Sequence, residues 1–355
     1  MMNSSGLAGF GITHPIIQAP MAGVSTPELA AAVSNAGALG SIAVGAVNAD
    51  TARQLIQRTR ALTDQPFNVN LFCHQQPQRS AELEQDWIGR LTPHFDRFGA
   101  NPPAQLNEIY LSFLDDPNML AVLLEEQPAV VSFHFGLPEL AWIKQLQNRG
   151  ILTLACVTSL SETQLAIAAG VDALVAQGVE AGGHRGLFDP HQDSGLTTMD
   201  LVTQLVSSVE RPIIAAGGIM TGADIAAALH AGAAAVQMGT AFVLCPESSA
   251  NAGYRAKLSR GAAVNTEITS AISGRPARGI INRAHTEIEP DNRADIPDYP
   301  LTYDAMKQLA TAAAAQGDEG YAAHWAGTGA GLARSMPAAQ LVETLVSELQ
   351  ASLNS

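Results

Sequence analysis

The sequence predicts an α/β fold: a (β/α)8 or TIM barrel with an insertion after the third strand and a mostly helical C-terminal cap. Eight short apolar segments follow one another along the first 245 residues, and helical segments lie between them. Strands that are apolar throughout, instead of alternating with polar residues, are typical of parallel sheets covered by helices on both faces. A barrel of eight such units needs about 250 residues, which this chain can supply.

An open, doubly wound sheet is the competing fold. That fold commonly carries G-x-G-x-x-G in the turn after the first strand, and this turn lacks the motif. The nearest match, Gly-Thr-Gly-Ala-Gly at 327–331, comes late and follows no predicted strand, so we expect a loop there.

The barrel elements are predicted in order from apolar runs and helical periodicity. The first strand stops at Pro20, and Gly178 follows the sixth. The predicted strands are 15–20, 38–44, 67–72, 129–135, 151–157, 173–176, 212–216 and 234–238. The predicted helices between them are 27–35, 49–62, 137–149, 161–169, 198–209 and 222–231.

The predicted division has three regions: a barrel domain at 1–245 that includes the insertion, a cap at 246–329, and a C-terminal helix at 330–355 that packs back on the barrel. The insertion, 73–116, is polar, carries Trp87 and Tyr110, and should lie over the strand ends. Beyond residue 245, helical patterns cover 248–260, 301–315 and 338–352, and 291–299 is a charged loop broken by proline.

The composition limits the function. The 355 residues are 47% hydrophobic and 15% charged, with a formal net charge of −14. Such an acidic chain is unsuited to nucleic acid or to an anionic membrane surface. We see no apolar run of about 20 residues and no signal peptide, and the three cysteines are far apart, so we expect a cytoplasmic enzyme.

The segment 173–186 carries the clearest chemical signal. A buried strand leads into Glu-Ala-Gly-Gly-His-Arg-Gly, in which Gly182 and Gly183 let the backbone approach a ligand and His184 stands beside them. Histidine is well suited to proton transfer near neutral pH. The alternative is a glycine-rich surface turn with a solvated histidine.

The other strand ends carry glycine and polar residues, and in a barrel these ends meet on one face. Gly217 and Gly218 follow the seventh strand, and Gly239 and Thr240 the eighth, where barrels commonly bind phosphate through backbone N–H groups. Tight turns are the alternative for these glycines. Asn70 and Gln177 could instead bond each other or nearby backbone.

The motifs together resemble the nitronate monooxygenases, formerly called 2-nitropropane dioxygenases, and their bacterial class I branch in particular. The resemblance rests on PIIQAPMAGVSTPELAAAVSNAGALGSI, FNVNLF, VSFHFGLP, QGVEAGGHRG, AAGGI, AVQMGTAFVLCPES, YPLTYDAMK and HWAGTGAGLAR. It covers nearly the whole chain. The first motif and AAGGI also occur in related FMN barrels, whereas HFGLP, EAGGHRG and QMGTAF together are more specific.

The resemblance implies a role for each matching residue. His184 would be the catalytic residue, and the substrate pocket would be formed by His134, Tyr299, Tyr303, Lys307 and Trp325. FMN would be held by Met21, Gly23, Asn70, Gln177, Gly182, Gly183, Gly217, Gly218, Gln237, Gly239 and Thr240. His134 could equally be a core histidine, and Lys307 an ordinary exposed lysine. The spacing of His184, Asp189 and His191 fits no metal-ligand pattern, so we expect no metal.

The implied activity is FMN-dependent oxidation of an alkyl nitronate, propionate 3-nitronate above all, by O2 through a flavin semiquinone. The products would be a carbonyl compound and nitrite or other nitrogen oxides, a reaction suited to detoxification. The alternative is an FMN-dependent NAD(P)H enoyl-acyl-carrier-protein reductase. A flavin-binding sensor or carrier without turnover is a third hypothesis. We expect no nucleic-acid or membrane partner, and a homodimer stays open.

Overall fold

The computed structural model describes residues 8–354 and confirms the barrel. Its eight-stranded parallel sheet has the order β1-β9-β8-β6-β5-β4-β3-β2. A bridge between Ile17 and Leu39 brings the first and last strands of this order together, with Gln18 N donating to Leu39 O over 2.9 Å. The strands are β1 (Ile16–Gln18), β2 (Gly40–Ala43), β3 (Phe67–Phe72), β4 (Val130–His134), β5 (Leu152–Val157), β6 (Ala173–Gln177), β8 (Ile213–Ala216) and β9 (Ala235–Met238).

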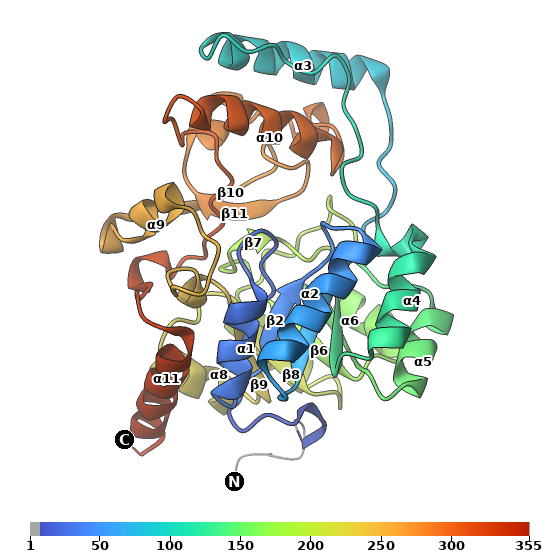
Figure 1. Cartoon of the computed structure of the whole chain (residues 1–355), viewed down its shortest axis with the longest axis vertical. Helices are drawn as coiled ribbons and strands as arrows, with labels where there is room; N and C mark the ends of the chain where they lie inside the picture. Colours follow the sequence, from blue (N-terminus) through green and yellow to red (C-terminus); the bar gives the residue numbers. More distant parts are fainter. Residues whose placement is uncertain (1–7, 355) are drawn as a thin grey trace.

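Helices surround this barrel (Figure 1). They are α1 (Pro27–Asn35), α2 (Ala49–Leu62), α4 (Pro117–Glu126), α5 (Leu140–Asn148), α6 (Leu160–Ala168), α7 (Thr198–Val206) and α8 (Gly222–His230). Most begin at a side chain that accepts a backbone N–H of the first turn, as Thr26 and Asn48 do. Helix α4 is the helix that the sequence leads us to expect after the insertion, although without bounds; Asp116 caps it and Pro117 occupies its first position.

The core has the two layers expected of a closed barrel. Inside it, Ile17, Leu154 and Val175 form a buried cluster with their neighbours from other strands. Outside it, the apolar faces of the helices pack on the opposite side chains of the same strands in a larger cluster. This double burial explains why the strand sequences contain so few polar residues.

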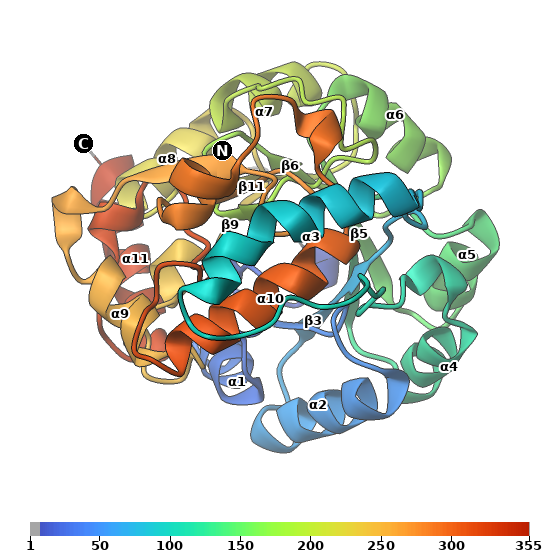
Figure 2. The same ribbon diagram turned by 90° about the horizontal axis from the view of Figure 1, so that it is seen from above.

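The insertion and the cap lie side by side over one end of the barrel (Figures 1 and 2). The insertion forms a helix that is not predicted from the sequence, α3 (Ala81–Asp96), and the cap supplies α10 (Leu301–Ala314). Trp87 and Leu91 share one buried cluster with Met306 and Leu309. This second core holds the two segments together, although about 200 residues separate them in the sequence.

The cap contains strands as well as helices. β10 (Thr266–Thr269) and β11 (Ala277–Ile280) pair with the two-residue strand β7 (Gly183–His184) in an antiparallel sheet of order β10-β11-β7. The sequence prediction has no strands in 266–281. The cap is therefore joined through its backbone to the loop that follows β6.

The last helix, α11 (Ala338–Leu353), packs against α8 and α1 and buries Leu341, Leu345 and Leu349. Glu348 fixes the contact with α8 by accepting the N–H of Gly222 over 2.8 Å. Shorter elements are α9 (Ala252–Leu258), a π-helix at Ala284–Ile288, and 3-10 turns at Ala8–Phe10, Phe113–Asp115, Thr240–Phe242, Gly261–Ala263, Arg293–Asp295 and Ala330–Leu332. Within residues 8–354 no helix has the length and apolar character of a membrane span. The division into three domains stays a prediction.

Candidate active site

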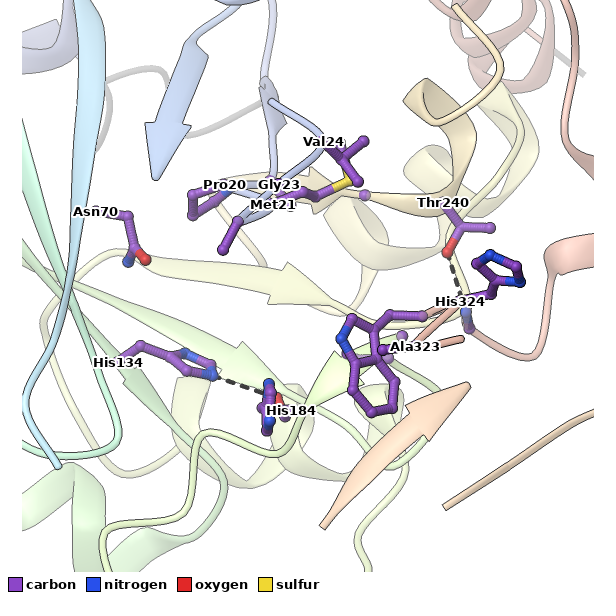
Figure 3. Close-up of a pocket in the computed structure, with 18 of the residues that line it drawn as sticks. Pro20, Met21, Gly23, Val24, Asn70, His134, His184, Thr240, Ala323 and His324 are labelled. Atoms are coloured by element: carbon purple, nitrogen blue, oxygen red, sulfur yellow. Dashed lines mark hydrogen bonds between the residues drawn. The ribbon is translucent and has the colours of Figure 1, made fainter. Parts of the chain in front are cut away.

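A cavity of about 830 Å³ lies between the carboxyl ends of the barrel strands and the cap. Every residue with a predicted catalytic, substrate or FMN role lines it: Met21, Gly23, Asn70, His134, Gln177, Gly182, Gly183, His184, Gly217, Gly218, Gln237, Gly239, Thr240, Tyr299, Tyr303, Lys307 and Trp325. Figure 3 shows several of them around one space, with the β1 loop opposite the two histidines. The structure thus brings all of these residues together, and their individual roles remain predictions.

His184 belongs to β7 and is held in place from the cap. Its backbone pairs with Ala277 of β11, and its ring Nε2 lies 2.9 Å from the hydroxyl of Ser273. The ring contacts those of Phe135 and Trp325, with centroids 5.4 and 5.2 Å away. Burial, followed by the nearby His134 and Arg275, lowers the pKa of His184 to about 3, so the ring is neutral at physiological pH.

Two side chains hold the backbone carbonyl of His184. Gln177 donates to it from Nε2 over 3.0 Å, and Nε2 of His134 lies 3.2 Å from it (Figure 3). Because a carbonyl only accepts, the proton of His134 lies on Nε2. Burial lowers the pKa of His134 to about 4, so this ring is also neutral. His134 and Gln177 therefore position the histidine loop in addition to lining the cavity.

Asn70 and Gln177 do not bond each other. Asn70 Nδ2 donates to the carbonyl and the hydroxyl of Ser132, over 3.2 and 3.0 Å. Gln177 Oε1 accepts from the N–H of Gly186 over 2.8 Å. Both amides thus use neighbouring groups, as the alternative interpretation of the sequence proposed, while Asn70 Oδ1 has no hydrogen-bond partner within residues 8–354.

Arg185 supports this loop from within the protein. Its side chain is fully buried and pairs with Asp193 through two bonds of 2.9 Å. It also donates to the carbonyls of Gln177 and Gly178, over 3.1 and 2.8 Å. Arg185 stands within one of the quoted motifs but has no predicted role, since nothing in the local pattern shows that it is buried.

Gly182 and Gly217 approach other parts of the chain too closely for any larger residue. A Cβ at Gly182 would lie 2.5 Å from Gly327 N, and one at Gly217 would lie 2.5 Å from Thr198 Oγ1. Gly217 and Gly218 have φ of 130° and 71°, which other residues rarely adopt. Thr240 Oγ1 accepts the N–H of Gly327 over 3.0 Å, so the tail completes the cradle. Loops of this kind are suited to binding a phosphate group through their backbone N–H groups.

A group of aromatic residues and one lysine forms the opposite wall. Lys307 donates from Nζ to the hydroxyl of Tyr110 over 2.8 Å, and the ammonium also lies 5.8 Å from the ring centre of Tyr303. Burial raises the pKa of Tyr303 to about 12 and holds the pKa of Tyr299 well above its usual range, so both hydroxyls stay protonated. This wall can donate hydrogen bonds to an anionic ligand.

Four residues of the site are not predicted as site residues. The sequence places Tyr110 only in the insertion, and Tyr254, Ser273 and His324 have no predicted role. His324 stacks on Tyr254 with a centroid distance of 4.7 Å, and both line the cavity. His324 directly precedes Trp325 in one of the quoted motifs, and this position is the sequence signal that could have indicated a site role for it. Tyr110 and Ser273 stand in segments without any such signal.

The fold and the site together define a class: an enzyme of the (β/α)8 type with glycine-rich loops and a buried neutral histidine at the strand ends. The family model for nitronate monooxygenase matches residues 4–348. The chain belongs to the nitronate monooxygenase family. It is therefore an oxidoreductase that acts on nitronates.

Individual relatives agree with this assignment. A protein of Paraburkholderia phytofirmans named nitronate monooxygenase is 58% identical over 345 residues, 97% of this chain and 94% of the relative. One of Pseudomonas aeruginosa with the same name is 56% identical, covering 96% and 97%. Among solved structures, the nitroalkane oxidase from Streptomyces ansochromogenes superposes with a TM-score of 0.87 at 39% identity, covering 97% and 98%.

Proposed function

We propose that the protein uses FMN to oxidise alkyl nitronates with O2, with propionate 3-nitronate as the preferred substrate. The products are a carbonyl compound and nitrite or related nitrogen oxides. The observation that carries this proposal is the placement of a glycine cradle and a buried neutral histidine in one cavity of about 830 Å³. When bound, FMN supplies the electron transfer between the nitronate and oxygen, and the protein supplies position and electrostatics.

The residues present fit FMN. The loops at Gly217–Gly218 and Gly239–Thr240 line the cavity and would bind the phosphate through backbone N–H groups. The strand ends beside them would contact the flavin ring. Asn70 is suited to this role because its Oδ1 is left without a partner among the described residues and can accept a ring N–H.

The aromatic wall would bind the substrate. A carboxylated nitronate carries two anionic groups, and the cavity offers the ammonium of Lys307 and the protonated hydroxyls of Tyr299 and Tyr303. An ammonium pairs well with a carboxylate, which favours propionate 3-nitronate over alkyl nitronates without a carboxylate. His184 would contact the reacting carbon or nitro group from the barrel side and could take a proton from a neutral nitroalkane.

An anaerobic absorption experiment tests this proposal. Propionate 3-nitronate is added to one sample of the purified flavoprotein, and NADH or NADPH to another. We expect the flavin spectrum to change with the nitronate and to stay unchanged with either nicotinamide. Bleaching by a nicotinamide without any response to nitronate would instead favour the enoyl-acyl-carrier-protein reductase, which the family match and the relatives do not favour.

Two other results would contradict parts of the proposal. A bound flavin that reacts with no donor would indicate a carrier, and a protein that cannot be reconstituted with FMN would exclude this cofactor. A cytoplasmic location and a homodimer belong to the same proposal. Cell fractionation and sedimentation at several concentrations test them.

A further inference from the structure

The cap segment from Ser273 to Arg278 is attached to the histidine loop at several points. Arg185 N donates to the carbonyl of Pro276 over 2.8 Å. Arg275 Nη2 donates to the carbonyl of Leu187 over 2.6 Å, and its guanidinium lies 4.4 Å from the ring centre of Phe135. Together with the pairing of β7 and β11, these contacts fix the backbone of His184. Among the described residues its ring packs against aromatic rings and has one hydrogen-bond partner.

That hydrogen-bond partner is the hydroxyl of Ser273, which is fully buried. Its oxygen lies 2.9 Å from His184 Nε2, 3.1 Å from the carbonyl of Arg275 and 3.3 Å from the N–H of Arg275. A hydroxyl has one proton to donate and two lone pairs that accept. The carbonyl can only accept, so it takes the hydroxyl proton. The lone pairs then accept from the Arg275 N–H and from His184 Nε2.

We infer that Ser273 is a positioning residue that holds His184 in the tautomer with its proton on Nε2 and leaves the Nδ1 lone pair free for the substrate. Nδ1 has no hydrogen-bond partner within the described residues, and His184 lines the cavity. Burial keeps the ring neutral, with its pKa lowered to about 3. A neutral imidazole has a single ring proton, so the nitrogen that carries this proton determines what the other can do.

The chemical consequence rests on the proposed function. With a neutral nitroalkane, the Nδ1 lone pair takes the proton from the α-carbon. The C–H bond breaks, its electron pair stays with the substrate as the nitronate, and His184 becomes an imidazolium whose Nε2–H still donates to Ser273. A nitronate already lacks this proton and requires no base. Ser273 should therefore matter for neutral nitroalkanes and much less for nitronates.

Nitroethane and ethyl nitronate form a matched pair of substrates for the test. In Ser273→Ala holoenzyme we expect kcat/KM for nitroethane to fall on the order of tenfold or more, and that for ethyl nitronate to change less than about twofold. Ser273→Thr keeps a hydroxyl and should restore part of the loss. Ser270→Ala is the control, because Ser270 lies in the same turn and supports it through its backbone carbonyl. Equal losses with both substrates, or no loss with either, would overturn the inference.

The tautomer can also be observed without turnover. In holoenzyme labelled with ¹⁵N-histidine, long-range ¹H–¹⁵N correlations identify the protonated ring nitrogen, and His184→Asn assigns the signal. We expect Nε2–H in the wild type and a new Nδ1–H population in Ser273→Ala. A wild-type ring protonated on Nδ1 would overturn the inference even if Ser273→Ala failed to fold. Failure of the proposed function would appear separately, as loss of wild-type turnover of ethyl nitronate.

Discussion

The ammonium of Lys307 and the hydroxyl of Tyr110 lie 2.8 Å apart and join the cap to the insertion across the cavity. Lys307 is exposed on α10, yet its Nζ also lies 5.1 Å from the ring centre of Tyr110. The lysine is thus held by an insertion residue about 200 positions earlier. In this respect Lys307 differs from an ordinary exposed helix lysine, which is the alternative interpretation of the sequence.

Replacing this lysine should affect charged substrates selectively. In Lys307→Met we expect KM for propionate 3-nitronate to rise on the order of tenfold, because an ammonium–carboxylate contact is lost. KM for ethyl nitronate, which has no carboxylate, should change less. Steady-state oxygen consumption measures both, with Lys144→Met, an exposed lysine on α5, as the control. Equal effects on the two substrates would mean that Lys307 does not bind the carboxylate.

His184→Asn should keep bound FMN and lose turnover. Asparagine approximates the shape of the imidazole near the backbone, but it cannot accept a proton at physiological pH. The flavin absorbance of the purified variant and its nitroethane activity measure the two effects. His191→Asn, an exposed histidine close to the same loop, should leave both unchanged. Full activity in His184→Asn would rule out its catalytic role.

The close approach of the two glycine loops gives a third prediction. In Gly182→Ala the new Cβ would lie 2.5 Å from Gly327 N, so the loops must separate. We expect weaker FMN binding and a lower melting temperature. A methyl group added at Gly89 in α3 would meet no atom within 4 Å, and Gly89→Ala should stabilise the protein by about 0.5–1 kcal/mol. Flavin release and thermal unfolding measure both, and unchanged FMN affinity in Gly182→Ala would contradict the prediction.

Loss of the buried guanidinium should destabilise the protein strongly. Arg185→Met removes an ion pair to Asp193 and leaves the carbonyls of Gln177 and Gly178 without this donor. We expect a loss of about 3 kcal/mol in the free energy of unfolding, measured by denaturant titration. Arg58→Met breaks an exposed pair with Glu28 and should change little. Similar stabilities of the two variants would show that burial of Arg185 does not matter.

The buried histidines predict how stability depends on pH. Burial lowers the pKa of His74, His134 and His324 to about 4, and that of His184 to about 3. Between pH 6.5 and 4 the unfolded chain binds protons that the native rings do not, so stability should fall as the pH falls through this window. Melting temperatures measured at constant FMN concentration test this. A melting temperature that stays flat from about pH 6.5 to about 4.5 would contradict it.

Much of the barrel could be predicted because its elements have local signals. β3 and α2 have the predicted bounds, Phe67–Phe72 and Ala49–Leu62, since an apolar run and a helical period each extend over several residues. β7 has only two residues, a glycine and a histidine, and a period cannot be seen in two positions. It exists because β11 pairs with it from about 90 residues further along the chain.

The same distinction applies to the site. Gly182, Gly183 and His184 stand together in one motif, so the sequence indicated a cradle with a histidine at its edge. Ser273 and Tyr110 act through contacts with residues 89 and 197 positions away. Neither residue has an unusual local pattern, and only the folded chain shows which partner it meets.

The pairing of β7 with β11 also determines when the site can form during protein synthesis. All eight barrel strands have been made once residue 238 is complete, but the strand and the hydroxyl that hold His184 come from residues 273–280. The aromatic wall and Gly327 follow later still. A nascent chain could therefore assemble its barrel while the histidine ring is still unanchored. The active site can therefore be completed only after all eight barrel strands have been synthesised.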